Sequence, residues 1–109
     1  MMFNESVVPT YYARIYLSGP IEDAKRWLRV YCSKGMCVNI TPTTYIYKYG
    51  EEEGYIVEII NYPRFPRTKA EIVSIAKNIA MGLMEDTCQG SFSIEYPNHT
   101  YYYDRRKDD

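Results

Sequence analysis

The sequence predicts an α+β fold of the ferredoxin-like βαββαβ type, a four-stranded antiparallel sheet with two helices on one face. Four segments show the alternating or apolar patterns of strands, and two others repeat apolar residues every three or four positions, as amphipathic helices do. Their order along the chain is strand, helix, strand, strand, helix, strand. Right-handed crossovers between these elements give the strand order 4-1-3-2.

The first strand and the first helix follow a short arm. Residues 1–10 have no regular period, so we interpret them as an N-terminal arm. Residues 11–17 alternate as a half-buried strand does. The face of this strand that points away from the core carries Tyr12, Arg14 and Tyr16. Pro20 begins the helix, because the first helical position needs no N–H, and Gly35 ends it.

The second and third strands are predicted to form a hairpin. Residues 36–49 have the periodicity of a strand, and Pro42, which cannot donate a ladder hydrogen bond, predicts a bulge or a sheet edge. Residues 50–54 read Gly-Glu-Glu-Glu-Gly and predict the hairpin loop. Residues 55–62 are apolar at nearly every position, so we expect the third strand to be central.

The second helix has the clearest pattern in the chain. Thr68 and Glu71 match the capping box, which predicts the start of a helix that continues to residues 87–90. Its apolar stripe consists of Ile72, Ile75, Ala76, Ile79 and Leu83. Residues 92–96 then alternate as the fourth strand, and residues 100–103 either continue it or add a short piece.

Length and composition predict one domain over residues 1–109, with residues 104–109 as a charged tail. A hydrophobic fraction of 46% is enough for one core. The sequence has neither an apolar run long enough to span a membrane nor a secretion signal. Three cysteines make an odd number, which suits a reducing compartment. We therefore expect a cytoplasmic protein without a membrane partner.

The charge balance argues against a dedicated nucleic-acid binder. The formal net charge is −1, with 13 basic and 14 acidic residues, whereas phosphate binding favours a basic excess. Residues 15–17, with Tyr16 at the centre, resemble the first strand of RNA-recognition modules, whose aromatic residue stacks on a base. The corresponding third strand departs from that family: Glu53 precedes Gly54 where the family has a basic residue. Nucleic acid is therefore an unlikely partner.

No motif with catalytic or metal-binding spacing stands out. Cys32 and Cys37 form one loose pair, whereas a structural zinc site needs two tight pairs of ligands. Cys88 and His99 have no third orienting group at recognisable spacing. A glycine-rich phosphate loop is also missing. We therefore predict no catalytic residues, no metal ligands and no cofactor.

The features that remain are typical of a binding surface. Tyrosine accounts for 13 of 109 residues, and it combines rigid apolar area with a hydroxyl group. The acidic hairpin and the connector at residues 62–67, with its aromatic and arginine residues, have the composition of interface elements. The predicted partner-binding residues are Tyr16, Tyr45, Tyr47, Glu51, Glu52, Glu53, Arg64 and Phe65.

These features favour a small non-enzymatic modulator that binds a protein partner, for example a nucleic-acid-binding complex. The profile is typical of phage-encoded inhibitors of bacterial machinery, which include anti-CRISPR proteins. The alternative is single-stranded nucleic-acid or small-ligand binding on the open tyrosine-rich face of the sheet. A third interpretation is a small-molecule enzyme or sensor with a polar pocket. The open face is apolar enough to pair with a second copy, so a homodimer is a further candidate.

Overall fold

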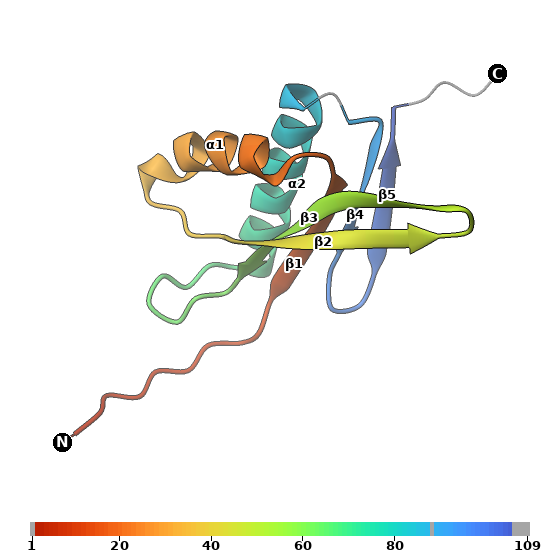
Figure 1. Ribbon diagram of the computed structural model, residues 1–109. Helices are drawn as coiled ribbons and strands as arrows, with labels where there is room; N and C mark the ends of the chain where they lie inside the picture. The colour runs from red at the N-terminus through yellow and green to blue at the C-terminus, as the bar shows by residue number, and fades with distance from the viewer. Residues whose placement is uncertain (1, 88, 106–109) are drawn as a thin grey trace.

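The computed structural model describes residues 2–87 and 89–105 (Figure 1). An extended arm leads into the first strand, and a single 3₁₀ turn, Cys32–Lys34, follows the first helix. The elements in chain order are β1 (Tyr12–Ser18), α1 (Ile21–Tyr31), β2 (Asn39–Tyr47), β3 (Gly50–Ile60), α2 (Lys69–Asp86), β4 (Ser91–Glu95) and β5 (Thr100–Asp104). The result is an α+β fold with two helices and five strands in the described part of the chain.

The sheet is antiparallel throughout, with the strand order β2-β3-β1-β4-β5. Both helices contribute to one core with the inward residues of β1, β3 and β4, so they cover the same face. Among the fully buried side chains of this core are Ile15, Val57, Ile79, Leu83 and Ile94. The other face carries no helix, and we call it the open face. Among the described residues, no helix is long and apolar enough to cross a membrane.

Local sequence signals explain both helices. The Thr68 hydroxyl accepts a hydrogen bond from the Glu71 N–H (3.1 Å), and the Glu71 carboxylate accepts one from the Thr68 N–H (2.8 Å). This is the predicted capping box, and it satisfies two N–H groups that the helix itself leaves unpaired. Pro20 lies at the N-cap of α1. Where the helices cross, Gly82 leaves space for the Trp27 ring, which a Cβ at that position would overlap.

The prediction of four strands is wrong by one. Of the two alternatives for residues 100–103, the structure has the second, because they add a short strand, β5, which pairs antiparallel with β4. The Pro97-Asn98 break allows the chain to reverse, and the Tyr96 N–H donates to the His99 carbonyl (2.8 Å) to close the turn. Asp104 is the last residue of β5, and residues 106–109 of the predicted tail lie outside the described residues.

The predicted hairpin loop at residues 50–54 is also wrong. These residues form the start of β3, and the turn consists of Lys48 and Tyr49. Tyr49 has a φ of 74°, the left-handed conformation that lets a two-residue turn close. Cross-strand pairing overrides the low strand propensity of glutamate. β2 is an edge strand whose pairing continues through Pro42, so an edge rather than a bulge accommodates the proline.

Replacing Ile79 by alanine tests the helix packing. Ile79 is fully buried in α2, and we expect Ile79→Ala to lower the free energy of unfolding by about 2–5 kcal/mol because of lost transfer energy and a residual cavity. Lys77, two residues earlier, is exposed, and Lys77→Ala should change the free energy of unfolding by about 0.5 kcal/mol at most. Chemical denaturation measures both values. Equal losses would contradict this packing of α2.

Replacing Gly54 by alanine tests the approach of β1 to β3. A Cβ on Gly54 would overlap the carbonyl oxygen of Leu17, which is backbone and cannot rotate away. We expect Gly54→Ala to cost more than about 2 kcal/mol of unfolding free energy. The matched control is Gly90→Ala, because a Cβ there has no atom within 4 Å. A Gly54→Ala protein as stable as the control would refute the close approach.

Candidate functional site

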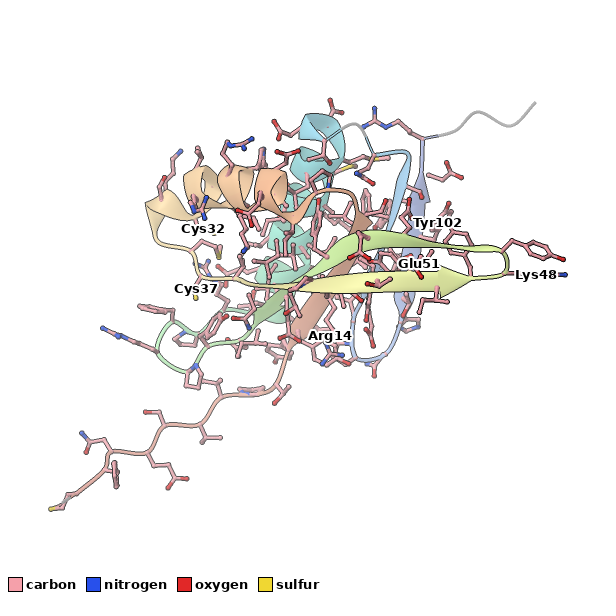
Figure 2. All side chains as sticks on the ribbon, in the orientation of Figure 1. Arg14, Cys32, Cys37, Lys48, Glu51 and Tyr102 are labelled. Carbon is pink, nitrogen blue, oxygen red and sulfur yellow. The ribbon has the colours of Figure 1, made fainter. Side chains whose placement is uncertain are left out.

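Strand register builds a row of polar side chains across the open face. Arg14 on β1 lies opposite Glu58 on β3 and Glu95 on β4. The row extends to Asn39 on β2 and Thr100 on β5. Because paired residues of antiparallel strands point to the same face, these five side chains line up across the whole sheet. Figure 2 labels Arg14 in this row.

Arg14 connects the two carboxylates of this row. Its Nε donates to Glu58 Oε2 at 2.7 Å, and its Nη1 lies 3.5 Å from Glu95 Oε2. Asn39 Nδ2 donates to the second oxygen of Glu58 (3.4 Å). The guanidinium also lies 4.4 Å from the centre of the Tyr12 ring, within the range of a cation–π contact. The hydrogen bond to Glu58 raises the pKa of Arg14, so this group stays positively charged.

The next row along the sheet carries two tyrosines, an isoleucine and a serine. Ile56, Tyr16, Ser93 and Tyr102 are paired in that order across β3, β1, β4 and β5. Tyr16 reaches back to the polar row, because its hydroxyl donates to Glu95 Oε1 at 2.6 Å. This hydrogen bond, with burial second, raises the pKa of Tyr16 to about 12. The Tyr16 hydroxyl is therefore a proton donor throughout the physiological pH range.

We call Tyr12, Arg14, Tyr16, Glu58 and Glu95 the acid–tyrosine cluster. The cluster contains two carboxylates and one guanidinium, so the formal charge of the cluster is −1. The carboxyl and guanidinium side chains keep between 29% and 39% of their exposure, so a ligand can reach them. Carboxylates and tyrosine rings together favour a positively charged organic ligand with hydroxyl or amino groups. The cluster is therefore the candidate functional site.

Of the predicted binding residues, the three tyrosines share the open face. Tyr16 lies in the cluster. Tyr45 lies over Gly54, and its hydroxyl donates to the Leu17 carbonyl (3.0 Å), so it also ties β2 to β1. Tyr47 ends β2 and is 58% exposed. The open face thus carries the tyrosines as predicted, but Tyr45 and Tyr47 are on the hairpin rather than in the cluster.

The other predicted binding residues are not brought together. Glu51, Glu52 and Glu53 begin β3 at the hairpin end, with Glu51 and Lys48 labelled in Figure 2. Arg64 and Phe65 lie in the connector after β3, at its opposite end (Figure 1), where the guanidinium lies 5.4 Å from the ring centre. The rest of β3, residues 54–60, separates the two groups. They do not form one site.

Sequence reasoning missed the carboxylates of the cluster. Glu58 and Glu95 are 37 positions apart, and no motif relates them. The available signal was a charged residue on the outward side of each central strand. This signal does not specify the strand register, and a shift by one residue would move either carboxylate to the other face. Only the pairing of both strands with β1 makes the two carboxylates neighbours of Arg14.

The two cysteines that the structure describes lie between α1 and β2. Cys32 is partly buried after α1 and Cys37 is exposed (Figure 2). Burial raises the pKa of Cys32, which disfavours a thiolate. Cys88, considered above with His99, lies outside the described residues. No group of three metal-ligating side chains is found within residues 2–87 and 89–105.

A cleft of about 440 Å³ lies between α2 and the β4–β5 turn, and Tyr12 is the one residue of the cluster that also lines it. Its lining includes Lys69, Lys77 and His99, and no acidic residue is among the described residues that line it. Its charge is therefore opposite to that of the cluster. The two regions suit ligands of opposite charge.

Comparison with solved structures identifies two chains with this fold. A phage SAM lyase in the apo state aligns with 99% of this chain and 100% of its own, at 14% sequence identity and a TM-score of 0.71. A phage SAM lyase in complex with S-methyl-5'-thioadenosine aligns with 95% of this chain and 96% of its own, at 17% identity and a TM-score of 0.68. The sequence matches no protein-family model and no curated protein.

The comparison corrects the functional interpretation. A non-enzymatic, protein-binding modulator was predicted because no catalytic motif is visible, yet the structures that share this fold over nearly the whole chain are phage enzymes. Nothing supports the interpretation as an inhibitor or an anti-CRISPR protein. The physical reason for the error is that the charged groups of the open face are assembled by strand pairing and not by a local motif.

Titration of Tyr16 tests the geometry of the cluster. In the folded protein the pKa of Tyr16 lies above 10, the ordinary value for a tyrosine. The stability that the Tyr16 hydroxyl contributes is therefore complete below about pH 10 and is lost as the pH rises toward 12. We expect Glu95→Gln to lower the pKa of Tyr16, since the amide is uncharged and accepts a weaker hydrogen bond. Phenolate absorbance measures this, with Glu22→Gln on α1 as the control. Identical titration curves for the two variants would contradict the contact.

Proposed function

We propose that this chain is an enzyme that cleaves S-adenosylmethionine without water and releases S-methyl-5'-thioadenosine. The observation that carries the proposal is a negatively charged acid–tyrosine cluster on a fold that aligns over 99% of this chain with a phage SAM lyase. The second solved structure binds S-methyl-5'-thioadenosine, the thioether that such a cleavage leaves. We assign the open face, and not the cleft, as the substrate side.

Charge explains this assignment. S-adenosylmethionine carries a sulfonium, an ammonium and a carboxylate, and its net charge is therefore positive. The cluster has a formal charge of −1 and attracts it, whereas the lysines of the cleft repel it. The product S-methyl-5'-thioadenosine is neutral. The cluster thus favours the substrate over the neutral thioether.

The cleavage balances without any further reactant. One oxygen of the substrate's own carboxylate attacks the γ-methylene carbon of the methionine chain, which is bound to sulfur. The new C–O bond forms as the C–S bond breaks, and the bonding electron pair stays on sulfur. The products are a neutral thioether and a five-membered lactone that keeps the ammonium group. No proton is transferred in this step, so the enzyme needs no general base.

The alternative route removes a proton from the neighbouring carbon and yields an alkene. It needs a base close to an unactivated C–H bond. The carboxylates of the cluster are poorly suited, because Glu58 is held by Arg14 and Asn39, and Glu95 is held by Arg14 and Tyr16. The oxygens of both carboxylates are already engaged by neighbouring donors, so they are less free to approach a C–H bond. The geometry therefore favours the attack by the substrate's carboxylate.

The residues of the cluster then bind and orient the substrate. Glu58 and Glu95 can accept hydrogen bonds from the ammonium and from the ribose hydroxyls. Arg14 holds both carboxylates in place, and Tyr16 fixes Glu95 from the other side. Charge is neutralised as the carboxylate approaches the sulfonium, so an apolar surrounding such as the Tyr12 ring and Ile56 favours the transition state.

Three broader statements accompany this proposal. We propose a phage origin, which the two phage neighbours support. We also propose that the fold is ferredoxin-like with β5 added at the edge, because the strand order without β5 is the predicted 4-1-3-2. A cytoplasmic location, a homodimer and a single domain over residues 1–109 stay predictions.

Incubation with S-adenosylmethionine tests the function. We expect S-methyl-5'-thioadenosine to accumulate, with a lactone as the other product. The lactone and the alkene product have the same mass, so proton NMR separates the two routes. When the reaction is run in water labelled with heavy oxygen, a lyase yields a four-carbon product that carries no heavy oxygen at early times. Hydrolysis would instead incorporate heavy oxygen from the water into this product. Absence of the thioether under all conditions would refute the proposal.

Variants of the cluster locate the site. We expect Glu95→Gln and Glu58→Gln to lower kcat/KM about ten- to a hundred-fold, the loss of one charge-assisted hydrogen bond. The matched control is Glu22→Gln, whose carboxylate is 69% exposed on α1 and should leave activity unchanged. Circular dichroism verifies folding of each variant. Full activity in both cluster variants would place the reaction elsewhere.

A further inference from the structure

The cleft on the helix side is built from segments that are far apart in the sequence. One wall comes from the first turns of α2, with Ile72 and Val73, and the other from β5 and the turn before it, with Tyr96 and Tyr101. Its volume of about 440 Å³ lies within the range of pockets for small organic molecules. The charged groups of the acid–tyrosine cluster lie on the opposite face of the sheet, and only Tyr12 borders both regions. The cleft is therefore a separate candidate site.

The charge of the cleft selects for an anion. Lys69 and Lys77 project from α2, two turns apart, and His99 lies at the turn opposite them. Neither ammonium group has an ion-pair partner among the described residues. The described lining residues include no aspartate or glutamate. An anionic group between the lysines would neutralise charge that the protein itself leaves unpaired.

The remaining lining favours a planar ring. Tyr96 and Tyr101 pack edge to face, with ring centres 5.7 Å apart, beside the apolar side chains of Ile72 and Val73. The Tyr96 hydroxyl is buried and has no hydrogen-bond partner among the described residues. Burial raises the pKa of Tyr96 to about 12, so this hydroxyl keeps its proton at physiological pH. Buried polar groups of this kind are otherwise satisfied.

We propose that this cleft binds a small planar aromatic anion, a ring with one carboxylate or phosphate group. The ring lies against Tyr101, Ile72 and Val73. The anionic group contacts Lys69 and Lys77. This site is distinct from the proposed lyase site, whose ligand is a cation.

Binding of naphthyl phosphate tests the proposal, with fluorescence as the readout. We expect saturable binding, and we expect naphthoate to bind as well if any aromatic anion is accepted. Naphthol, which has the ring alone, should bind at least about ten-fold more weakly, because one charge-assisted contact contributes about 1.5–3 kcal/mol. Inorganic phosphate alone should not displace the probe at equal concentration. If naphthoate binds and naphthyl phosphate does not, the anionic group that the cleft accepts is a carboxylate.

Two variants locate the probe. Lys77→Ala should weaken naphthyl phosphate about ten-fold and leave naphthol unchanged, and Val73→Trp should abolish binding of both by filling the cleft. The matched control is Lys48→Ala, an exposed lysine at the hairpin turn, which should bind as the parent protein does. Lys77 is exposed, so its variant keeps the fold.

Other outcomes overturn the proposal. Equal affinities for naphthyl phosphate and naphthol, or an unchanged affinity in Lys77→Ala, would show that the cleft does not select an anion. Loss of binding in Glu95→Gln but not in Lys77→Ala would place the probe on the open face. The assay does not depend on cleavage of S-adenosylmethionine, so a failed lyase assay and a failed binding assay are separate results.

Discussion

The pairing of β1 with β3 and β4 at the same time is the constraint on which the rest of the structure depends. It buries Ile15 between Val57 and Ile94 on the helix side. The same register places Arg14 between the carboxylates of the two neighbouring strands on the open face. A slip by one residue would expose the core residues and bury these charges. Packing energy in the core therefore also holds the charged cluster in place.

The two faces of the sheet differ in charge, and this difference organises the functional proposals. The open face combines two carboxylates, one guanidinium and tyrosine rings, which suits a cationic substrate. The cleft at the helix side presents lysines and a buried tyrosine hydroxyl, which suits an anion. Tyr12 is the one residue of the cluster that also borders the cleft. The start of β1 thus connects the two regions.

The absence of a local motif has a structural explanation. A phosphate loop or a zinc site draws its ligands from a few neighbouring residues, so its spacing is visible in a sequence. The acid–tyrosine cluster draws its groups from three strands, and its carboxylates are Glu58 and Glu95. Both residues pair with Arg14, and their separation along the sequence does not indicate this pairing. An interpretation from motifs alone therefore led to a non-enzymatic protein, and the comparison of folds corrected it.

The sequence by itself determined both helices and four of the strands. Local signals suffice there, because Thr68 and Glu71 cap α2 through their own backbone contacts, and alternation assigns Tyr12, Arg14 and Tyr16 to one face. Only the tertiary structure decided that residues 100–104 add a fifth strand and that the acidic residues 51–53 extend β3. Both outcomes depend on hydrogen bonds to a partner strand. Glu95 beside Tyr16 and the lysine-lined cleft likewise depend on long-range pairing, which local propensity does not contain.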